Sequence, residues 1–235
     1  MSVYISRNYI ITSLTPSSSS SPSALAIMVE YYPLKTLCGS LSDAAFNHPG
    51  NGLVYPVNAV ACDSHGLTRE LHSLYNFAKV YARRRRLYHL ARAVRDDRDP
   101  PGTIVVEQSQ ECDTSPHLIA MVLQYSWGAP IEDNKLSQSV MKTTLDCHHA
   151  EGLKDDTKAN RLEYFKTCVK KLIIFAMGCH GLERLLIPAG IGRGGRTDQE
   201  WEDNYIPILQ GMASRLQAVG VEVVLLKNEK FRTCP

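Results

Sequence analysis

Apolar and polar residues are grouped along this chain in blocks typical of strands and helices that follow one another. Short apolar runs predict strands at residues 32–37, 52–58, 103–107, 118–124, 182–188 and 221–226. Apolar residues three and four positions apart predict helices, one carrying Leu67, Leu71, Leu74 and Tyr75, a second over 160–177 and a third over about 198–219. Strands that alternate with helices predict a three-layer α/β sandwich.

A glycine-rich loop joins the strand that ends at Pro188 to the last predicted helix. Glycines occupy positions 190, 192, 194 and 195. Glycines let a backbone come close to a ligand with its N–H groups directed at it, and the N-terminus of the next helix favours anions. The loop therefore predicts a phosphate-binding site.

Two common kinds of phosphate loop are excluded by the residues after Gly195. The spacing Gly190-x-Gly192-x-x-Gly195 matches the dinucleotide fingerprint, but that fold needs several more strand–helix units after its fingerprint. Only one helix and one strand are predicted beyond the loop, so it belongs to the last strand–helix–strand unit. The loop also lacks the Gly-Lys-Ser or Gly-Lys-Thr that the P-loop of nucleotide triphosphatases requires. A phosphate loop of another family remains.

Length and composition set the expected organisation of the chain. Its 235 residues, 44% hydrophobic and 21% charged, predict one globular domain over 30–235 with an insertion at 130–156. Residues 1–29 include five consecutive serines at 17–21 and no acidic residue, which predicts a disordered tail. An organelle-targeting segment is the alternative for this tail, and translation from Met28 is left open.

Net charge and cysteine content indicate which partners and which compartment to expect. A net charge of +2 gives no reason to expect nucleic acid as a partner, and no apolar run approaches the roughly 20 residues of a membrane span. Seven cysteines without a Cys-x-x-Cys pair predict a reducing, intracellular compartment, cytoplasmic or nuclear. Cys147, His148 and His149 are interpreted as loop residues, so neither a metal nor a cofactor is expected.

Four separated segments give the chain a resemblance to a known family. They are 39–43, then 56–59 with the loop 62–66 after it, then 124–128, and finally 187–195 with Trp201 beyond it. In sequence and in order they resemble the macrodomain family, the ADP-ribose-binding module. The resemblance covers about residues 30–228 and implies an α/β/α sandwich with a mixed central sheet.

The resemblance implies that the ligand is ADP-ribose, free or attached to a protein. The loop around the diphosphate would consist of Gly190, Ile191, Gly192, Arg193, Gly194 and Gly195. The loop that ends at Gly66 would close over the distal ribose. Asn58 is either a ribose contact or a brace for its own loop. Tyr205 is either a nucleotide contact or, as the favoured interpretation, a core residue.

The resemblance leaves two functions open, hydrolysis of an ADP-ribose conjugate and binding without turnover. The glycine loop is similar to that of the branch with ADP-ribosyl-glutamate hydrolases and ADP-ribose-1''-phosphate phosphatases, which favours hydrolysis. Asp198, Asp63 and His65 are the candidates to position water or accept a proton. Asp198 is equally a candidate helix N-cap, in competition with Thr197.

The sequence departs from the family's enzymes at two residues that would work together with these catalytic candidates. Ala61 stands where the most active branch has a second asparagine, and no lysine lies on the 103–108 strand, where the acidic-residue branch has one. These departures weaken the case for catalysis, and hydrolysis remains the preferred function because of the glycine loop, with binding without turnover as the alternative.

A run of arginines at 83–86, continued by Arg92, Arg95 and Arg98, has two interpretations. The favoured one is a solvated helix face balanced by Asp96, Asp97 and Asp99. The alternative is a surface for an acidic partner, RNA or a poly(ADP-ribose) chain.

Overall fold

The computed structural model describes residues 34–87, 92–109, 114–125, 130, 156–193 and 197–227. The predicted tail, all of the predicted insertion except its two end residues, and Gly194 and Gly195 lie outside this part of the chain, as does the 147–149 segment.

The described residues form strands and helices close to the predicted ones. The strands are β1 (Lys35–Cys38), β2 (Asn51–Asn58), β3 (Ile104–Glu107), β4 (His117–Gln124), β5 (Arg184–Pro188) and β6 (Glu222–Lys227). The helices are α1 (Gly66–Leu74), α3 (Lys158–Gly178), α4 (Asp198–Asn204) and α5 (Ile206–Gln217), with 3-10 turns at Ala44–Phe46 and Arg95–Asp97. None of these helices is long and apolar enough to cross a membrane.

The strands form one mixed sheet in the order β1-β6-β5-β2-β4-β3. Each neighbouring pair is parallel except β3 and β4, which run antiparallel. The β2–β4 pairing runs from Gly52 opposite His117 to Asn58 opposite Gln124, with a shift in register at its last residue. The mixed central sheet implied by the family resemblance is therefore confirmed.

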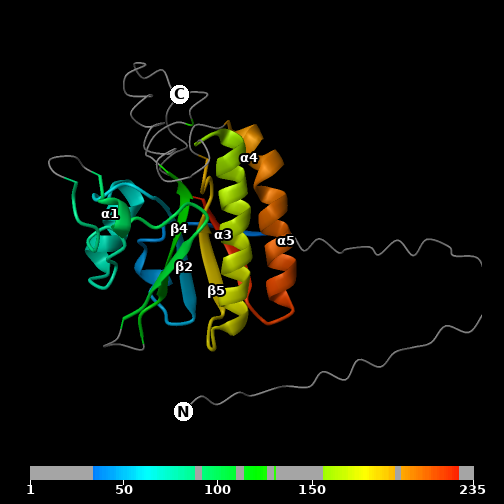
Figure 1. The fold of residues 1–235 in the computed structure, drawn as a ribbon. Helices are drawn as coiled ribbons and strands as arrows, with labels where there is room; N and C mark the ends of the chain where they lie inside the picture. The colour runs from blue at the N-terminus through cyan, green and yellow to red at the C-terminus, as the bar shows by residue number, and fades with distance from the viewer. Residues whose placement is uncertain are drawn as a thin grey trace, which may run out of the picture. The chain divides into compact units, whose positions relative to one another are not determined.

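Helices cover both faces of this sheet (Figure 1). Alternate residues of a strand point to opposite faces, so neighbouring residues of β2 lie in different cores. Val54 packs with α3 and α5 around Leu172 and Leu209, whereas Tyr55 packs on the opposite face with Leu71 of α1. The predicted three-layer α/β/α sandwich is therefore confirmed.

The single helix predicted over 198–219 is wrong, because the chain forms two helices there. α4 ends at Asn204 and α5 begins at Ile206. Pro207 lies in the first turn of α5 and has no N–H to donate to the carbonyl four residues earlier. The apolar spacing continues across this interruption, and for that reason the pattern alone predicts one helix.

Close packing at Gly52 joins three strands of the sheet. A Cβ atom at this position would lie 2.7 Å from Leu185 Cδ2 and 3.0 Å from Ile119 Cδ1. Both neighbours are fully buried, so they have little room to move. The glycine is therefore required by the spacing of β2, β4 and β5.

We predict that Gly52→Val destabilises the fold by about 1–3 kcal/mol through overpacking. The matched control is Gly211→Ala in α5, where a Cβ meets nothing within 4 Å. That variant should gain about 0.5–1 kcal/mol from helix propensity. Chemical denaturation of both variants checks the prediction, and wild-type stability of Gly52→Val would contradict it.

Candidate functional site

The sheet separates between its two central strands toward their carboxyl ends. β2 and β5 pair only from Asn51 opposite Arg184 to Leu53 opposite Leu186. Beyond this point β2 stays paired with β4 up to Asn58, and β5 stays paired with β6 up to Pro188. Ligands of open α/β sheets bind outside the carboxyl ends of strands where the chain order changes direction. The loops after Asn58 and Pro188 leave the sheet at such a place.

The described part of the glycine loop is a pair of tight turns. Gly190 and Gly192 have φ angles of 82° and 72°, in the left-handed region that favours glycine. The Ile191 N–H donates to the Pro188 carbonyl at 3.1 Å, and the Arg193 N–H donates to the Gly190 carbonyl at 2.9 Å. Two of the N–H groups of residues 190–193 therefore donate to carbonyls of the turns themselves.

The loop is anchored on the sandwich core by Trp201 and Ile191. The Trp201 Nε1–H donates to the Ile191 carbonyl at 2.9 Å, and the Ile191 side chain is buried. At Gly192 a Cβ would lie 3.1 Å from Tyr205 Cε1 and 3.2 Å from Leu123 Cδ1. The absence of a side chain at Gly192 is therefore needed for core packing as well as for the turn.

The structure places Tyr205 in the core. Its side chain is fully buried, and its ring centroid lies 4.6 Å from that of Phe165. This is the position that the favoured interpretation predicts. A contact between Tyr205 and a nucleotide stays a prediction.

Thr197, and not Asp198, is the N-cap of α4. Its hydroxyl accepts the Glu200 N–H at 3.1 Å, while Glu200 Oε2 accepts the Thr197 N–H at 2.8 Å, which completes a capping box. Asp198 is the first residue of the helix, and its carboxylate lies 2.5 Å from an Arg193 guanidinium nitrogen. The candidate catalytic carboxylate is thus paired with an arginine of the glycine loop.

Asn58 braces the loop that follows β2. Its Oδ1 accepts the Ala61 N–H at 2.7 Å, and its own N–H donates to the Tyr81 hydroxyl at 3.1 Å. These bonds fit the bracing interpretation of Asn58, and a ribose contact stays a prediction. Ala61 contributes its backbone to this brace.

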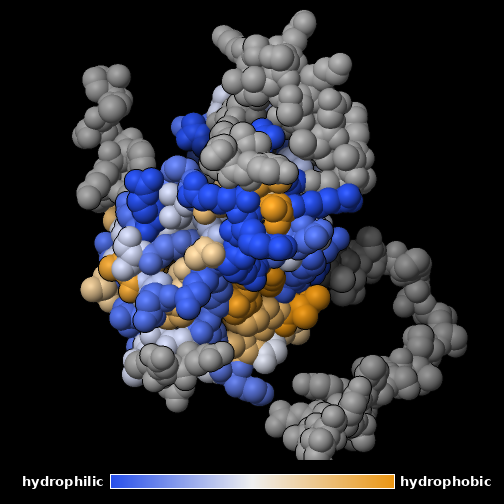
Figure 2. Space-filling model, turned by 60° about the vertical axis from the view of Figure 1, so that its left-hand side comes forward, coloured by the Kyte–Doolittle hydropathy of each residue, from blue (hydrophilic) through white to orange (hydrophobic). Residues whose placement is uncertain are grey.

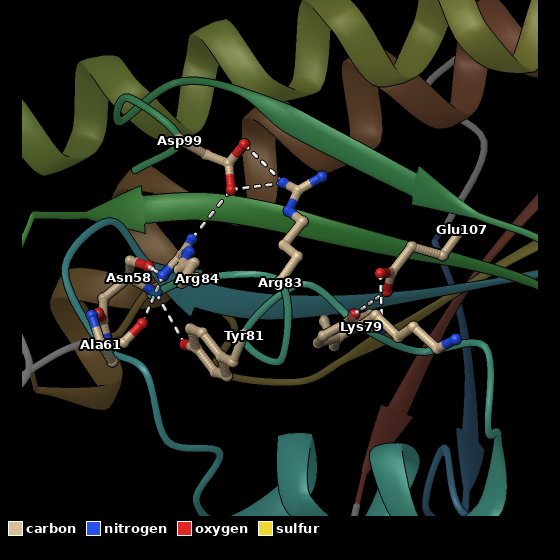
Figure 3. Close-up of polar contacts among 9 residues, drawn as sticks. Asn58, Ala61, Lys79, Tyr81, Arg83, Arg84, Asp99 and Glu107 are labelled. Carbon is tan, nitrogen blue, oxygen red and sulfur yellow. Dashed lines mark hydrogen bonds and ion pairs between the residues drawn. The ribbon is translucent and has the colours of Figure 1, made fainter. Parts of the chain in front are cut away.

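Arg84 holds the same loop through its carbonyl groups (Figure 3). Its Nη1 donates to the carbonyls of Asn58 at 2.9 Å and Ala61 at 2.8 Å, and its Nη2 donates to Asp99 at 3.0 Å. The guanidinium carbon lies 4.9 Å from the Tyr81 ring centre. The Arg84 side chain is completely buried. A buried cation with this set of partners fixes the position of the loop at the end of β2.

The other arginines of the 83–86 run are exposed, and each is paired with an aspartate. Arg83 pairs with Asp99, Arg85 with Asp97 and Arg86 with Asp63. The predicted helix face is wrong, because these residues lie in turns and an isolated bridge. The predicted balance by Asp97 and Asp99 is confirmed.

Figure 2 shows many hydrophilic side chains on the side of the molecule that carries α1. On the arginine-rich segment, aspartates pair with the four arginines at 83–86. The hydrogen bonds from Arg85 lower the pKa of Asp97 to about 2, which keeps this carboxylate charged. An acidic partner would have to compete with these carboxylates.

The remaining predicted residues lie on the loop between β2 and α1. His65 precedes the helix without capping it, and Gly66 opens the helix with a φ of 50°. Asp63 is held by Arg86. In the described residues no three His, Cys, Asp or Glu side chains gather as a metal site.

A second buried ion pair lies at this edge of the sheet, and no sequence pattern predicts it. Arg161 in the first turn of α3 donates to both oxygens of Asp156 at 2.9 and 2.6 Å, and the two side chains are 2% and 4% exposed. Arg161 also donates to Gln124 Oε1 at 3.1 Å. This pair ties the end of β4 to α3.

Two surface hollows lie away from the glycine loop. One is lined by Arg83, Asp96, Asp97, Arg98 and Asp99. The other is lined by Asn47, Ser73, Leu74, Tyr75, Asn76, Phe77, Ser109 and Ser115, near the amino-terminal ends of β2 and β4.

Comparisons with known proteins find similar folds among solved structures. No protein-family model matches the chain, and no curated protein matches it. A solved protein of unknown function from Bacteroides thetaiotaomicron is similar with a TM-score of 0.50 and 11% identity, over 83% of this chain and 97% of that one. At this identity the likeness concerns the fold.

Macrodomain structures from Oceanobacillus iheyensis are also among the similar structures. One mutant matches with a TM-score of 0.49 and 13% identity, over 83% of this chain and 84% of that one. Another mutant, solved with ADPR, matches with a TM-score of 0.45 and 12% identity, over 83% and 85% of the two chains.

We predict that Arg84→Met destabilises the protein by about 3 kcal/mol, because two buried carbonyls and part of Asp99 lose their donor. Arg85→Met is the matched control, since the Arg85 side chain is 71% exposed and its loss should leave the unfolding free energy close to wild type. Urea unfolding of both variants makes the comparison. Equal losses in the two variants would contradict the bracing role of Arg84.

Proposed function

We propose that this protein binds ADP-ribose at the carboxyl ends of β2 and β5. The diphosphate would lie on the backbone N–H groups of the glycine loop, and the distal ribose would lie between this loop and residues 59–66. The separation of β2 from β5 is the observation that carries the proposal. Beyond their last paired residues the two strands lead into two loops, one after Asn58 and one after Pro188, and side chains hold both loops in place.

The backbone geometry supports an anion as the ligand. Gly190 and Gly192 turn the chain twice within four residues, as glycines do in anion-binding loops, and Trp201 holds this part of the loop on the core. The loop does not depend on a ligand to be anchored. A preformed site of this kind loses little conformational entropy on binding.

The opposite loop supports the same site. Asn58 and Arg84 fix the backbone from Asn58 to Ala61, so the chain enters α1 from a defined position. The order of the four sequence motifs supports ADP-ribose as the specific ligand, because the same order is found in the ADP-ribose-binding family that the chain resembles.

We predict that calorimetry detects ADP-ribose binding and that Gly190→Asp weakens it about ten-fold more than Gly190→Asn does. Asp and Asn tolerate the left-handed backbone about equally, so the two variants differ mainly by one negative charge beside the diphosphate. Equal affinities of the two variants would place the diphosphate elsewhere. Absence of wild-type binding at millimolar ADP-ribose would overturn the proposed function.

Hydrolysis of an ADP-ribose conjugate is the second proposal. Asp198 supports it, because its carboxylate is 81% exposed beside the glycine loop and does not cap the helix. A carboxylate in that position has access to water and to a ligand on the loop. It would orient water toward the linkage between ADP-ribose and a glutamate side chain, or toward a terminal phosphate.

If Asp198 acts in this way, wild-type protein releases label from ADP-ribosylated glutamate and Asp198→Ala loses at least about 100-fold in rate. Asp203→Ala, on the same short helix, is the control and should keep full activity. Binding of ADP-ribose without label release would assign the protein to the non-catalytic class. Equal rates of wild type and Asp198→Ala would remove Asp198 from the mechanism.

A further inference from the structure

We infer that Arg193 is a phosphate-binding side chain that exchanges its ion pair with Asp198 for the diphosphate of the ligand. Asp198 then competes with the ligand for Arg193 and lowers the affinity of the site. This inference rests on the proposed ADP-ribose binding and adds to it a specific cation and its competitor.

The described part of the glycine loop, residues 190–193, is held by contacts other than the Arg193–Asp198 pair. Trp201 bonds the Ile191 carbonyl, and the Gly190 carbonyl accepts the Arg193 N–H within the turn. α4 is capped by Thr197 and Glu200. Because these contacts are separate from the ion pair, the pair can open without moving the loop or the helix.

The ion pair itself is exposed to solvent. The Arg193 side chain is 46% exposed and the Asp198 side chain 81% exposed, with 2.5 Å between the charged atoms. Exposed pairs contribute little to stability, because water and dissolved ions screen them. A diphosphate that carries more negative charge than one carboxylate is a stronger partner for the same guanidinium.

The Arg193 side chain lies close to the first turn of the glycine loop. A Cβ at Gly190 would lie 3.9 Å from Arg193 Cδ, so the aliphatic part of Arg193 lies over the first glycine of the turn. The guanidinium is therefore within reach of an anion on the Gly190–Arg193 backbone. Its planar donors bind phosphate oxygens in pairs.

The helix after the loop does not supply this positive charge. α4 has only seven residues, and its first turn holds two carboxylates, Asp198 and Glu200. Glu200 already accepts the Thr197 N–H, which lowers the pKa of Glu200. The helix N-terminus is thus occupied by carboxylates of the chain itself. Arg193 is the described cation whose side chain lies over the turn.

The test is ADP-ribose calorimetry on the full chain and its variants. Arg193→Gln should weaken binding about ten-fold through loss of a charge-assisted contact. Asp198→Asn should tighten binding about two- to five-fold, because it removes the competing carboxylate. In the Arg193→Gln background, Asp198→Asn should change nothing.

The matched controls carry the same chemical changes away from the loop. Arg184→Gln breaks an exposed pair with Glu222 at the amino-terminal end of β5, and Asp203→Asn removes a charge from the same helix as Asp198. Both should leave the affinity unchanged. Unchanged binding by Arg193→Gln, or weaker binding by Asp198→Asn, would overturn the inference while ADP-ribose binding itself stands. Failure of the wild-type protein to bind would instead overturn the proposed function.

Discussion

Beyond Leu53 and Leu186, strands β2 and β5 are no longer paired, although both continue toward the same edge of the sheet. Backbone groups freed in this way need other partners when they are buried. The Asn58 carbonyl bonds to Arg84, and the Ile191 carbonyl bonds to Trp201. The two loops are thus fixed by side chains rather than by each other. In the proposed site, these two fixed loop segments would already be in place when a ligand arrives.

The arginines of this chain show that position decides what a charge does. Arg84 is buried, and its partners make it part of the fold. Arg83 and Arg85 are exposed, and each is paired with an aspartate, Arg83 with Asp99 and Arg85 with Asp97. Arg193 is paired with an exposed carboxylate beside the glycine loop, and in our proposal the diphosphate replaces that partner. Arg193, which lies outside the basic run, is therefore the arginine that we assign to the ligand.

Much of the fold could be predicted from the sequence, because apolar periodicity reports burial directly. β2 and β4 are buried on both faces and appear as continuous apolar runs. The break at Tyr205 could not be predicted, because helical spacing continues across it. In the proposed site, the glycines predict a loop after the strand that ends at Pro188, and the structure has a loop there with positive φ angles at Gly190 and Gly192. Nothing in the run of four arginines distinguishes Arg84 as the buried one, because its partners reach it only in the folded chain.

A crystal structure of the protein grown with ADP-ribose tests the proposed site most directly. We expect the diphosphate on the N–H groups of the 190–193 turn, with Arg193 moved from Asp198 to a phosphate oxygen. A nucleotide bound elsewhere, such as in the hollow lined by Tyr75 and Phe77, with the glycine loop empty, would contradict the proposed site.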